Sequence, residues 1–207
     1  MSTPTLLETI RIVDGEAPLL KYHQRRVDRS RRIYYAKAPV FRLSHVLDRL
    51  ELPATGVHKL RLLYGTALES YSITPYRVRP VHTLRVVHAD DLHYRRKYAD
   101  RAAINQLFDL RQDCDDVLIV QQGHVTDCSY ANLAFYDSGQ WHTPAWPLLP
   151  GARREYLIEQ GVVRPSIIRL RDIHHFETAR LFNSMMEWEE GPLLSVAAIR
   201  NDCLPGG

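Results

Sequence analysis

Short runs of alternating polar and apolar residues, separated by turn-forming residues, constrain the fold of this chain most strongly. In the first half, VHKLRLLYG, LESYSITPY and HTLRVVH follow one another from Val57 and are broken at glycine and proline residues. In the second half, Gln122-Gly123 and Ser138-Gly139 separate DDVLIV, VTDCSYANLAFYD and QWHTP. A period of two between turn signals is typical of strands in antiparallel sheets. The sequence therefore predicts mostly antiparallel sheets in both halves.

The segments between these runs predict helices. Residues 21–35 and 98–111 have apolar side chains at helical spacing. A short helix is predicted at 44–50, with Ser44 as its N-terminal cap. A further helix, ARREYLIEQ, begins after a proline-glycine pair and ends at a glycine.

Three other patterns complete the predicted architecture. At the N-terminus, Asp14-Gly15 lies between LLETIRIV and EAPLL and predicts a hairpin. Later runs at 166–171 and 178–186, followed by PLLSVAAI, predict further strands. The expected fold class is α+β, with mostly antiparallel sheets and helices packed on them.

A polar and charged stretch, DDLHYRRK, divides the chain in two. We expect a smaller N-terminal α+β domain at 1–90, an interdomain crossing at 91–97 and a larger C-terminal domain at 98–207. A side chain at the end of the crossing is able to enter a crevice between the two domains.

Composition excludes several classes of protein. The net charge of +3 over 207 residues is too small to indicate a nucleic-acid partner. No run approaches the roughly 20 apolar residues of a membrane span, and the first residues lack a secretion signal, so no membrane association is expected. Three cysteines without paired spacing, Cys114, Cys128 and Cys203, favour a reducing cytoplasm. The histidines form no HExxH or other metal-ligand motif, so no metal is expected.

Lysine is scarce, which shortens the search for a nucleophilic amine. Only four of the 27 basic residues are lysines, and Lys97 ends the crossing just before a predicted helix. Asp127 lies within a predicted strand, where a carboxylate needs a partner. The LPGARR turn at 149–154 leads into a helix whose free N–H groups favour a phosphate, and Arg26 would add a bidentate contact. Together these groups suit a phosphorylated aldehyde cofactor, although a surface lysine, a turn aspartate and a plain helix start would explain them separately.

The same elements, in this order, resemble the class IV aminotransferases, which have the type IV fold of pyridoxal-phosphate enzymes. The resemblance begins with ETIRIVDG and YHQRRVDRS and continues through RKYADR, GHVTDCSYAN, WHTP, LLPGARR and LFNSM. It covers nearly the whole chain, and several spaced motifs must coincide to produce it. It implies a two-domain fold and pyridoxal 5'-phosphate (PLP) as the cofactor.

The resemblance also implies a set of site residues. Lys97 matches the lysine that forms the Schiff base, and Asp127 occupies the position of a glutamate that pairs with the pyridine nitrogen. Asn132 matches a structural asparagine of the strand motif. The phosphate-binding positions are Arg26, the backbone of Ala152 and Arg153, and the turn at Ser184 and Met185. The sequence departs from the family pattern at three points. Asp127 has a shorter carboxylate side chain, Lys97-Tyr98-Ala99-Asp100 replaces the frequent K-xx-N, and the expected N-terminal domain is shorter than in the larger transaminases.

The activity that the resemblance implies is transamination of an amino acid or related small amino compound through Lys97. A first alternative is 4-amino-4-deoxychorismate lyase, which forms 4-aminobenzoate and pyruvate. A second is a catalytically silent homologue that only binds a ligand. Candidates for holding the substrate carboxylate are Arg11, Arg61, Tyr64 and Arg77. A homodimer is expected from the same resemblance.

Overall fold

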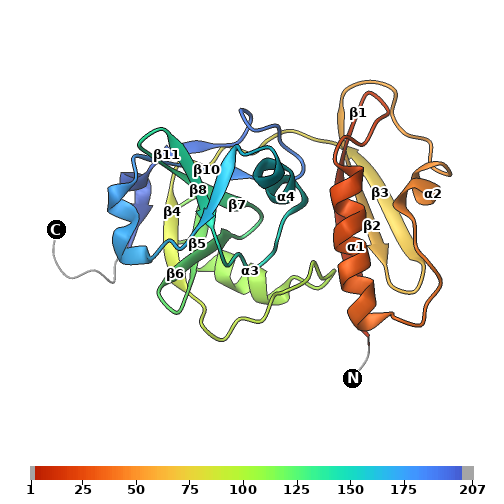
Figure 1. The fold of residues 1–207 in the computed structure, drawn as a ribbon, viewed down its shortest axis with the longest axis horizontal. Coiled ribbons are helices and arrows are strands. Elements are labelled where there is room, and N and C mark those ends of the chain that lie inside the picture. The colour runs from red at the N-terminus through yellow and green to blue at the C-terminus, as the bar shows by residue number, and fades with distance from the viewer. Residues whose placement is uncertain (1–2, 202–207) are drawn as a thin grey trace.

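The computed structural model describes residues 3–201, which form two α+β halves lying side by side (Figure 1). The N-terminal half contains β1 (Leu6–Val13), α1 (Leu20–Tyr34), α2 (Leu43–Leu47), β2 (Val57–Tyr64) and β3 (Leu68–Pro75). The C-terminal half contains β4 (Leu84–His88), α3 (Ala102–Asp109), β5 (Asp116–Gln121), β6 (His124–Cys128), β7 (Asn132–Asp137), β8 (Gln140–Pro144), α4 (Ala152–Glu159), β9 (Val163–Ser166), the 3-10 helix η1 (Leu170–His175), β10 (Thr178–Phe182), β11 (Leu193–Ser195), the 3-10 helix η2 (Val196–Ala198) and β12 (Ile199–Arg200). The fold class expected from the sequence is confirmed.

The N-terminal half is a three-stranded antiparallel sheet, in the order β1-β2-β3, with α1 packed on one face (Figure 1). Leu6, Ile10 and Ile12 of β1 alternate along the strand and are fully buried in the core beneath α1. The predicted N-terminal hairpin is wrong, because β1 pairs along its whole length with β2 instead. After the Asp14-Gly15 turn, a single bridge joins Val13 to Glu16 before the chain enters α1.

The C-terminal half contains two sheets, with strand orders β11-β10-β7-β8-β9 and β12-β4-β5-β6. Both sheets contribute buried side chains to one core, which includes Leu84 and Leu118 from the second and Phe135 and Leu181 from the first. Three pairings are parallel, namely β4–β5, β4–β12 and β8–β9. These pairings join segments far apart in sequence and are not visible in local patterns.

Several predicted boundaries are corrected by these pairings. The strand at Leu84–His88 was expected in the N-terminal unit, but it pairs with β5 and β12 and so joins the C-terminal sheet. The run at 166–171 is not a strand; β9 ends at Ser166 and η1 begins four residues later. The helix expected at 98–111 is shorter and begins at Ala102, whose backbone N–H is capped by the Asp100 carboxylate at 2.8 Å.

The short second helix is also corrected. It begins at Leu43, and its N-cap residue is Arg42, with no side-chain cap hydrogen bond, so Ser44 is not the cap. Instead, the backbone N–H of Leu43 donates to the Gln24 side chain of α1 at 2.8 Å. Contact with α1 therefore fixes the start of this helix.

The two halves are joined by a polar contact between α1 and α4. Arg25 and Arg29 of α1 both bind the Glu155 carboxylate, at 3.0 Å and 2.8 Å, and Arg25 also pairs with Glu159. On the far side, Arg11 of β1 donates to Glu190 at 2.9 Å. Within residues 3–201, every helix is too short or too polar to span a bilayer.

Candidate active site

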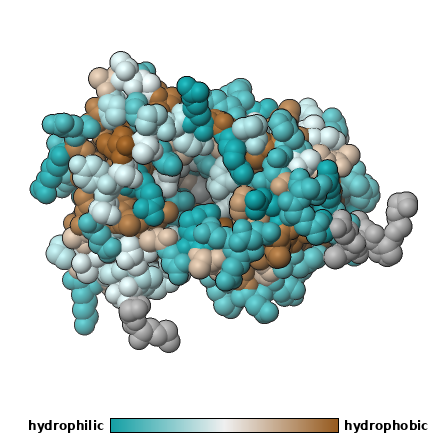
Figure 2. Space-filling view, turned by 180° about the vertical axis from the view of Figure 1, so that it is seen from behind, coloured by the Kyte–Doolittle hydropathy of each residue, from teal (hydrophilic) through white to brown (hydrophobic). Residues whose placement is uncertain are grey.

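A pocket of about 530 Å³ lies where the two halves meet. The molecular surface is hollowed between the halves (Figure 2). Arg26 of α1 contributes to the lining from the N-terminal half, and Lys97 contributes from the crossing. The remaining lining comes from the C-terminal half, chiefly the end of β6, the turn before α4 and the Asn183–Ser184 turn.

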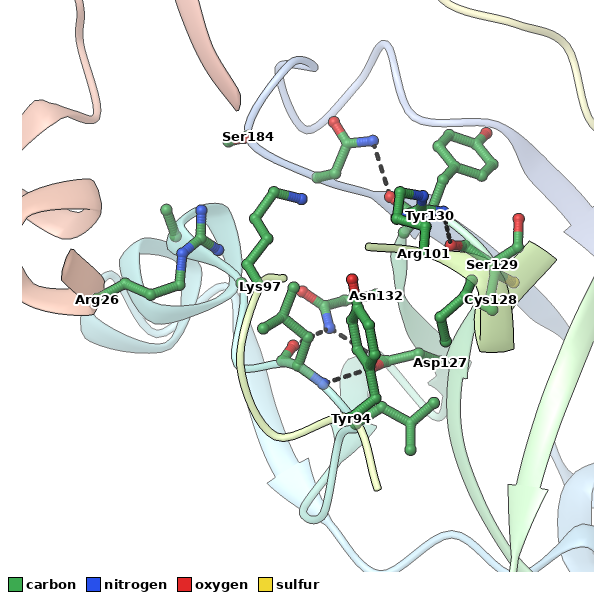
Figure 3. A pocket seen from close by; sticks show the side chains of 17 residues that line it. Arg26, Tyr94, Lys97, Arg101, Asp127, Cys128, Ser129, Tyr130, Asn132 and Ser184 are labelled. Atoms are coloured by element: carbon green, nitrogen blue, oxygen red, sulfur yellow. Dashed lines mark hydrogen bonds between the residues drawn. The ribbon is translucent and has the colours of Figure 1, made fainter. Parts of the chain in front are cut away.

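Lys97 is held in place by backbone contacts with the N-terminal sheet. Its carbonyl accepts a hydrogen bond from the Leu7 backbone at 2.8 Å, and Ala99 donates to the Thr5 carbonyl at 3.0 Å. The side chain extends into the pocket, with Arg26 on one side and Asp127 on the other (Figure 3). Burial, together with the positive charge of Arg26, lowers the pKa of the Lys97 ammonium from 10.5 to about 7. Near neutral pH, a large share of the molecules therefore carries the free amine, which is the nucleophilic and basic form.

Asp127 lies near the end of β6 and is almost completely buried. One carboxylate oxygen accepts from the Asn132 amide at 2.7 Å, and the other accepts from the Leu149 backbone at 2.9 Å. Burial raises the pKa of Asp127 to about 6, although these hydrogen bonds and the charge of Arg154 oppose the rise. Each oxygen keeps a second lone pair, so the carboxylate is able to accept from a cationic N–H group in the pocket.

Asn132 and Gly151 fix the geometry around this carboxylate. The Asn132 amide donates to Asp127 and also to the Leu149 carbonyl, at 2.7 Å and 2.9 Å, so it ties β6 to the turn before α4 (Figure 3). A Cβ atom on Gly151 would lie only 2.2 Å from the Asn132 side-chain oxygen. Glycine at this position therefore allows the start of α4 to approach the strand.

A buried charge cluster lies behind Lys97. Glu8 of β1 is fully buried and accepts both the Arg26 Nε, at 2.8 Å, and the Arg26 Nη2. It also binds His23 at 2.6 Å. Burial alone would raise the pKa of Glu8, but the charge and hydrogen bonds of Arg26 lower it to about 2. The carboxylate thus fixes the Arg26 guanidinium and leaves its Nη1 without a protein acceptor among residues 3–201.

The side of the pocket near α4 offers donors for an anion. The N-cap residue of α4 is Gly151, and no side chain caps this helix start. Free N–H groups in the first turn and the helix dipole favour a negative group there. Ser184 lines the same pocket and donates its hydroxyl to the Thr9 carbonyl at 2.8 Å.

The structure brings together five of the seven positions that the sequence assigned to the cofactor. They are Arg26, Lys97, Asp127, Ala152 and Ser184. The other two do not line the pocket.

Both exceptions have contacts of their own. The Arg153 side chain forms a fork with the Glu187 carboxylate, with two contacts of 2.8 Å, and is buried away from the pocket. Met185 is 3% exposed, and its carbonyl accepts from Arg11 at 2.7 Å.

The expected substrate-binding residues do not line this pocket. Tyr64 is in the N-terminal core, stacked on Phe41 at a centroid distance of 5.3 Å, because the β2 register turns it towards α1. Arg11 is held by Glu190 and the Met185 carbonyl. Arg61, on β2, is half-buried and outside the pocket lining, and Arg77 is exposed.

Sequence reasoning missed other residues of this region. Glu8 was not selected, although in LLETIRIV it shares a strand face with Leu6 and Ile10, and a carboxylate at an inward position signals a buried partner. Arg101 lines the pocket and donates to the Ser129 carbonyl at 2.8 Å (Figure 3). Its contact depends on tertiary structure and leaves no local signal. Residues 3–201 contain no cluster of three or more side chains able to hold a metal ion.

Comparison with known proteins identifies the family. The family model for amino-transferase class IV matches residues 5–190. The chain belongs to the class IV aminotransferase family. Members of this family are PLP-dependent enzymes, and the motif order recognised in the sequence is confirmed by the match.

Individual relatives support the same assignment. A protein from Haemophilus somnus, provisionally named a 4-amino-4-deoxychorismate lyase, is 34% identical with a TM-score of 0.81, covering 89% of this chain and 98% of that one. An uncharacterized protein of Haemophilus influenzae is 35% identical over 183 residues, or 87% of this chain and 97% of the relative. A provisionally named aminodeoxychorismate lyase of Schizosaccharomyces pombe is 33% identical over 85 residues, or 39% of this chain and 37% of the relative.

Proposed function

We propose that the protein binds PLP and uses Lys97 to move protons at the amine-bearing carbon of a small amino substrate. The proposal rests on two groups that line one pocket. They are the Lys97 amine, whose pKa is about 7, and the Asp127 carboxylate. A lysine with an ordinary pKa would be protonated and unable to act as a nucleophile or base near neutral pH.

The residues present fit the cofactor. Burial raises the pKa of the Asp127 carboxyl more than its hydrogen bonds and the charge of Arg154 lower it, and a protonated pyridine nitrogen would add a further compensating positive charge. Arg26 and the free N–H groups in the first turn of α4 would hold the phosphate, next to the turn at Ser184. Lys97 would hold the aldehyde carbon of PLP through its Nζ atom. When bound there, PLP supplies an electron sink for the carbon that loses a proton.

The chain's own groups then have separate tasks. Lys97 Nζ would take the proton from the amine-bearing carbon of the substrate and deliver it to a second position. Asp127 keeps a proton on the ring nitrogen, and Asn132 keeps Asp127 pointed into the pocket. Arg26, fixed by Glu8, resists displacement of the bound phosphate.

Two reactions use these groups equally well. We propose 4-amino-4-deoxychorismate lyase activity as the first candidate, because the Haemophilus somnus and Schizosaccharomyces pombe relatives, at 34% and 33% identity, are both provisionally named for it. Loss of a proton at the amine-bearing carbon and departure of the side chain as pyruvate would give 4-aminobenzoate. Transamination, which the sequence alone placed first, is the second candidate and is supported by the family model.

Cofactor binding is tested by the absorbance of the purified protein after incubation with PLP. An absorption band at about 410–430 nm is expected for a lysine-bound cofactor. The band should disappear in Lys97→Ala and persist in Lys59→Ala, a lysine on β2 outside the pocket lining. Failure of the wild-type protein to retain any cofactor would favour the silent homologue.

The two activities are separated by products. Incubation with 4-amino-4-deoxychorismate should release pyruvate and 4-aminobenzoate in equal amounts. Keto-acid exchange with amino acids, assayed in parallel, should be slow. The reverse result would support transamination and remove the lyase proposal.

We also propose a homodimer, on the basis of family membership. Light scattering during size exclusion should give about twice the chain mass of 24.0 kDa. A mass of one chain would contradict this proposal.

A further inference from the structure

A second, smaller pocket lies beside the first, and we propose that it is a binding site for a phosphate-type oxyanion. Its volume is about 250 Å³. Four arginines line it: Arg26 and Arg29 of α1, and Arg95 and Arg96 of the crossing. The Leu149-Pro150 turn and Ser30 complete the wall.

The charge in this pocket is only partly compensated. Glu8 neutralises Arg26, and Glu155 neutralises Arg29 through a contact of 2.8 Å. Among residues 3–201, neither Arg95 nor Arg96 has a carboxylate partner. The pocket therefore carries two uncompensated positive charges.

Arg96 provides a second, independent observation. Its Nε is buried and has no hydrogen-bond partner within the described part of the chain. Its Nη1 donates to the Arg95 carbonyl at 2.6 Å, which holds the guanidinium in place. Its Nη2 is neither enclosed nor hydrogen-bonded among residues 3–201, so this nitrogen is able to donate to an anion in the pocket.

The arrangement favours a tetrahedral oxyanion over a carboxylate. The arginines approach from two separate elements, α1 and the crossing. A planar carboxylate is satisfied by one guanidinium fork, whereas a phosphate has three or more oxygens pointing in different directions. The acidic groups nearest to these arginines do not repel an anion strongly, because both oxygens of Glu155 are already bound by Arg25 and Arg29.

The second pocket is distinct from the one that contains Lys97. The two share only Arg26 and Leu149, and neither Lys97 nor Asp127 lines the smaller pocket. Arg26 lines both pockets, and its contact with Glu8 fixes the guanidinium that anions in the two pockets would share.

The test is a calorimetric titration of inorganic phosphate into the PLP-loaded protein, at constant ionic strength in chloride. We expect saturable binding to one site. Arg95→Gln and Arg96→Gln should each weaken it about tenfold or more, since each removes a charge-assisted hydrogen bond. Arg32→Gln, an exposed arginine of α1 outside this pocket, is the matched control and should change affinity less than twofold.

Titrations with other anions define the class of ligand. Glycerol phosphate should bind if the natural ligand is a phosphate ester, and inorganic phosphate alone if it is the free ion. Tighter binding of succinate than of either phosphate would overturn the oxyanion assignment. If Arg32→Gln weakens phosphate binding as much as the two pocket substitutions do, binding depends on the general positive charge of this surface. That result would also overturn the proposal.

The result is independent of the proposed function. If phosphate binds the cofactor-free protein but PLP displaces it, the anion occupies the larger pocket and the second site does not exist. If the protein takes up no PLP, the Arg95→Gln and Arg96→Gln variants still identify the arginine pocket, because neither residue lines the larger one. Thermal unfolding of each variant confirms that the fold is intact.

Discussion

Replacing Lys97 by methionine should stabilise the cofactor-free protein. Burial beside Arg26 lowers the pKa of Lys97 from 10.5 to about 7, so the folded state binds this proton less tightly than the unfolded state does. Each pKa unit is worth about 1.36 kcal/mol, so the charged lysine costs up to ~5 kcal/mol of folding free energy. Methionine has a similar length and carries no charge, so the Lys97→Met variant avoids this cost.

The sign of the pH dependence follows from the direction of the shift. Below pH 7, both states are protonated at Lys97 and the full cost is present. Between pH 7 and 10.5 the unfolded state binds more protons than the folded state, so wild-type stability rises with pH. The advantage of Lys97→Met should therefore be largest below pH 7 and shrink to about 2 kcal/mol near pH 9.

The assay is urea unfolding of the cofactor-free wild-type and variant proteins from pH 6 to pH 9. Lys37→Met, at an exposed lysine outside the pocket, is the control and should stay within about 0.5 kcal/mol of wild type. Equal stability of Lys97→Met and wild type at every pH would refute the reasoning. Such a result would mean that the amine at position 97 is fully hydrated and not held in the pocket.

Three further substitutions test the surroundings of the site. Gly151→Ala places a Cβ 2.2 Å from the Asn132 side-chain oxygen and should cost about 1–3 kcal/mol of stability, measured by urea unfolding. Asn132→Ala removes a 2.7 Å donor from Asp127 and should raise the pKa of that carboxyl above about 6, observed by carbon NMR titration; an unchanged value would show that the amide does not hold the carboxylate. Glu8→Gln leaves Arg26 buried without its counter-charge and should cost about 3–5 kcal/mol at pH 7, with the difference from wild type shrinking as the pH falls towards about 2.

The sequence was informative wherever the physical signal is local. Lysine scarcity selected Lys97, and a carboxylate within a strand selected Asp127. The helix ARREYLIEQ is observed as α4, with Gly161 at a φ of +70° just beyond its end. These features depend on neighbouring residues or on residue type, and both are visible without a structure.

Long-range contacts escaped the sequence analysis. The parallel pairing of β4 with β5 joins strands 32 residues apart at Leu84 and Asp116, which no local pattern encodes. The Arg153 side chain binds Glu187, 34 residues further along the chain, and the motif, which concerned only the Arg153 backbone, gave no sign of this contact. Tyr64 was selected as a substrate contact, but strand register decided which face it occupies.

The backbone hydrogen bond between Leu7 and Lys97 fastens the backbone of Lys97 to the first half of the molecule. The carboxylate opposite it is anchored in the second half by β6 and the turn before α4. The proposed site is therefore complete only when the two halves are in contact. Under the proposed function, any motion that separates α1 from α4 would move the Lys97 amine away from Asp127, so the angle between the two halves would control the rate of the reaction.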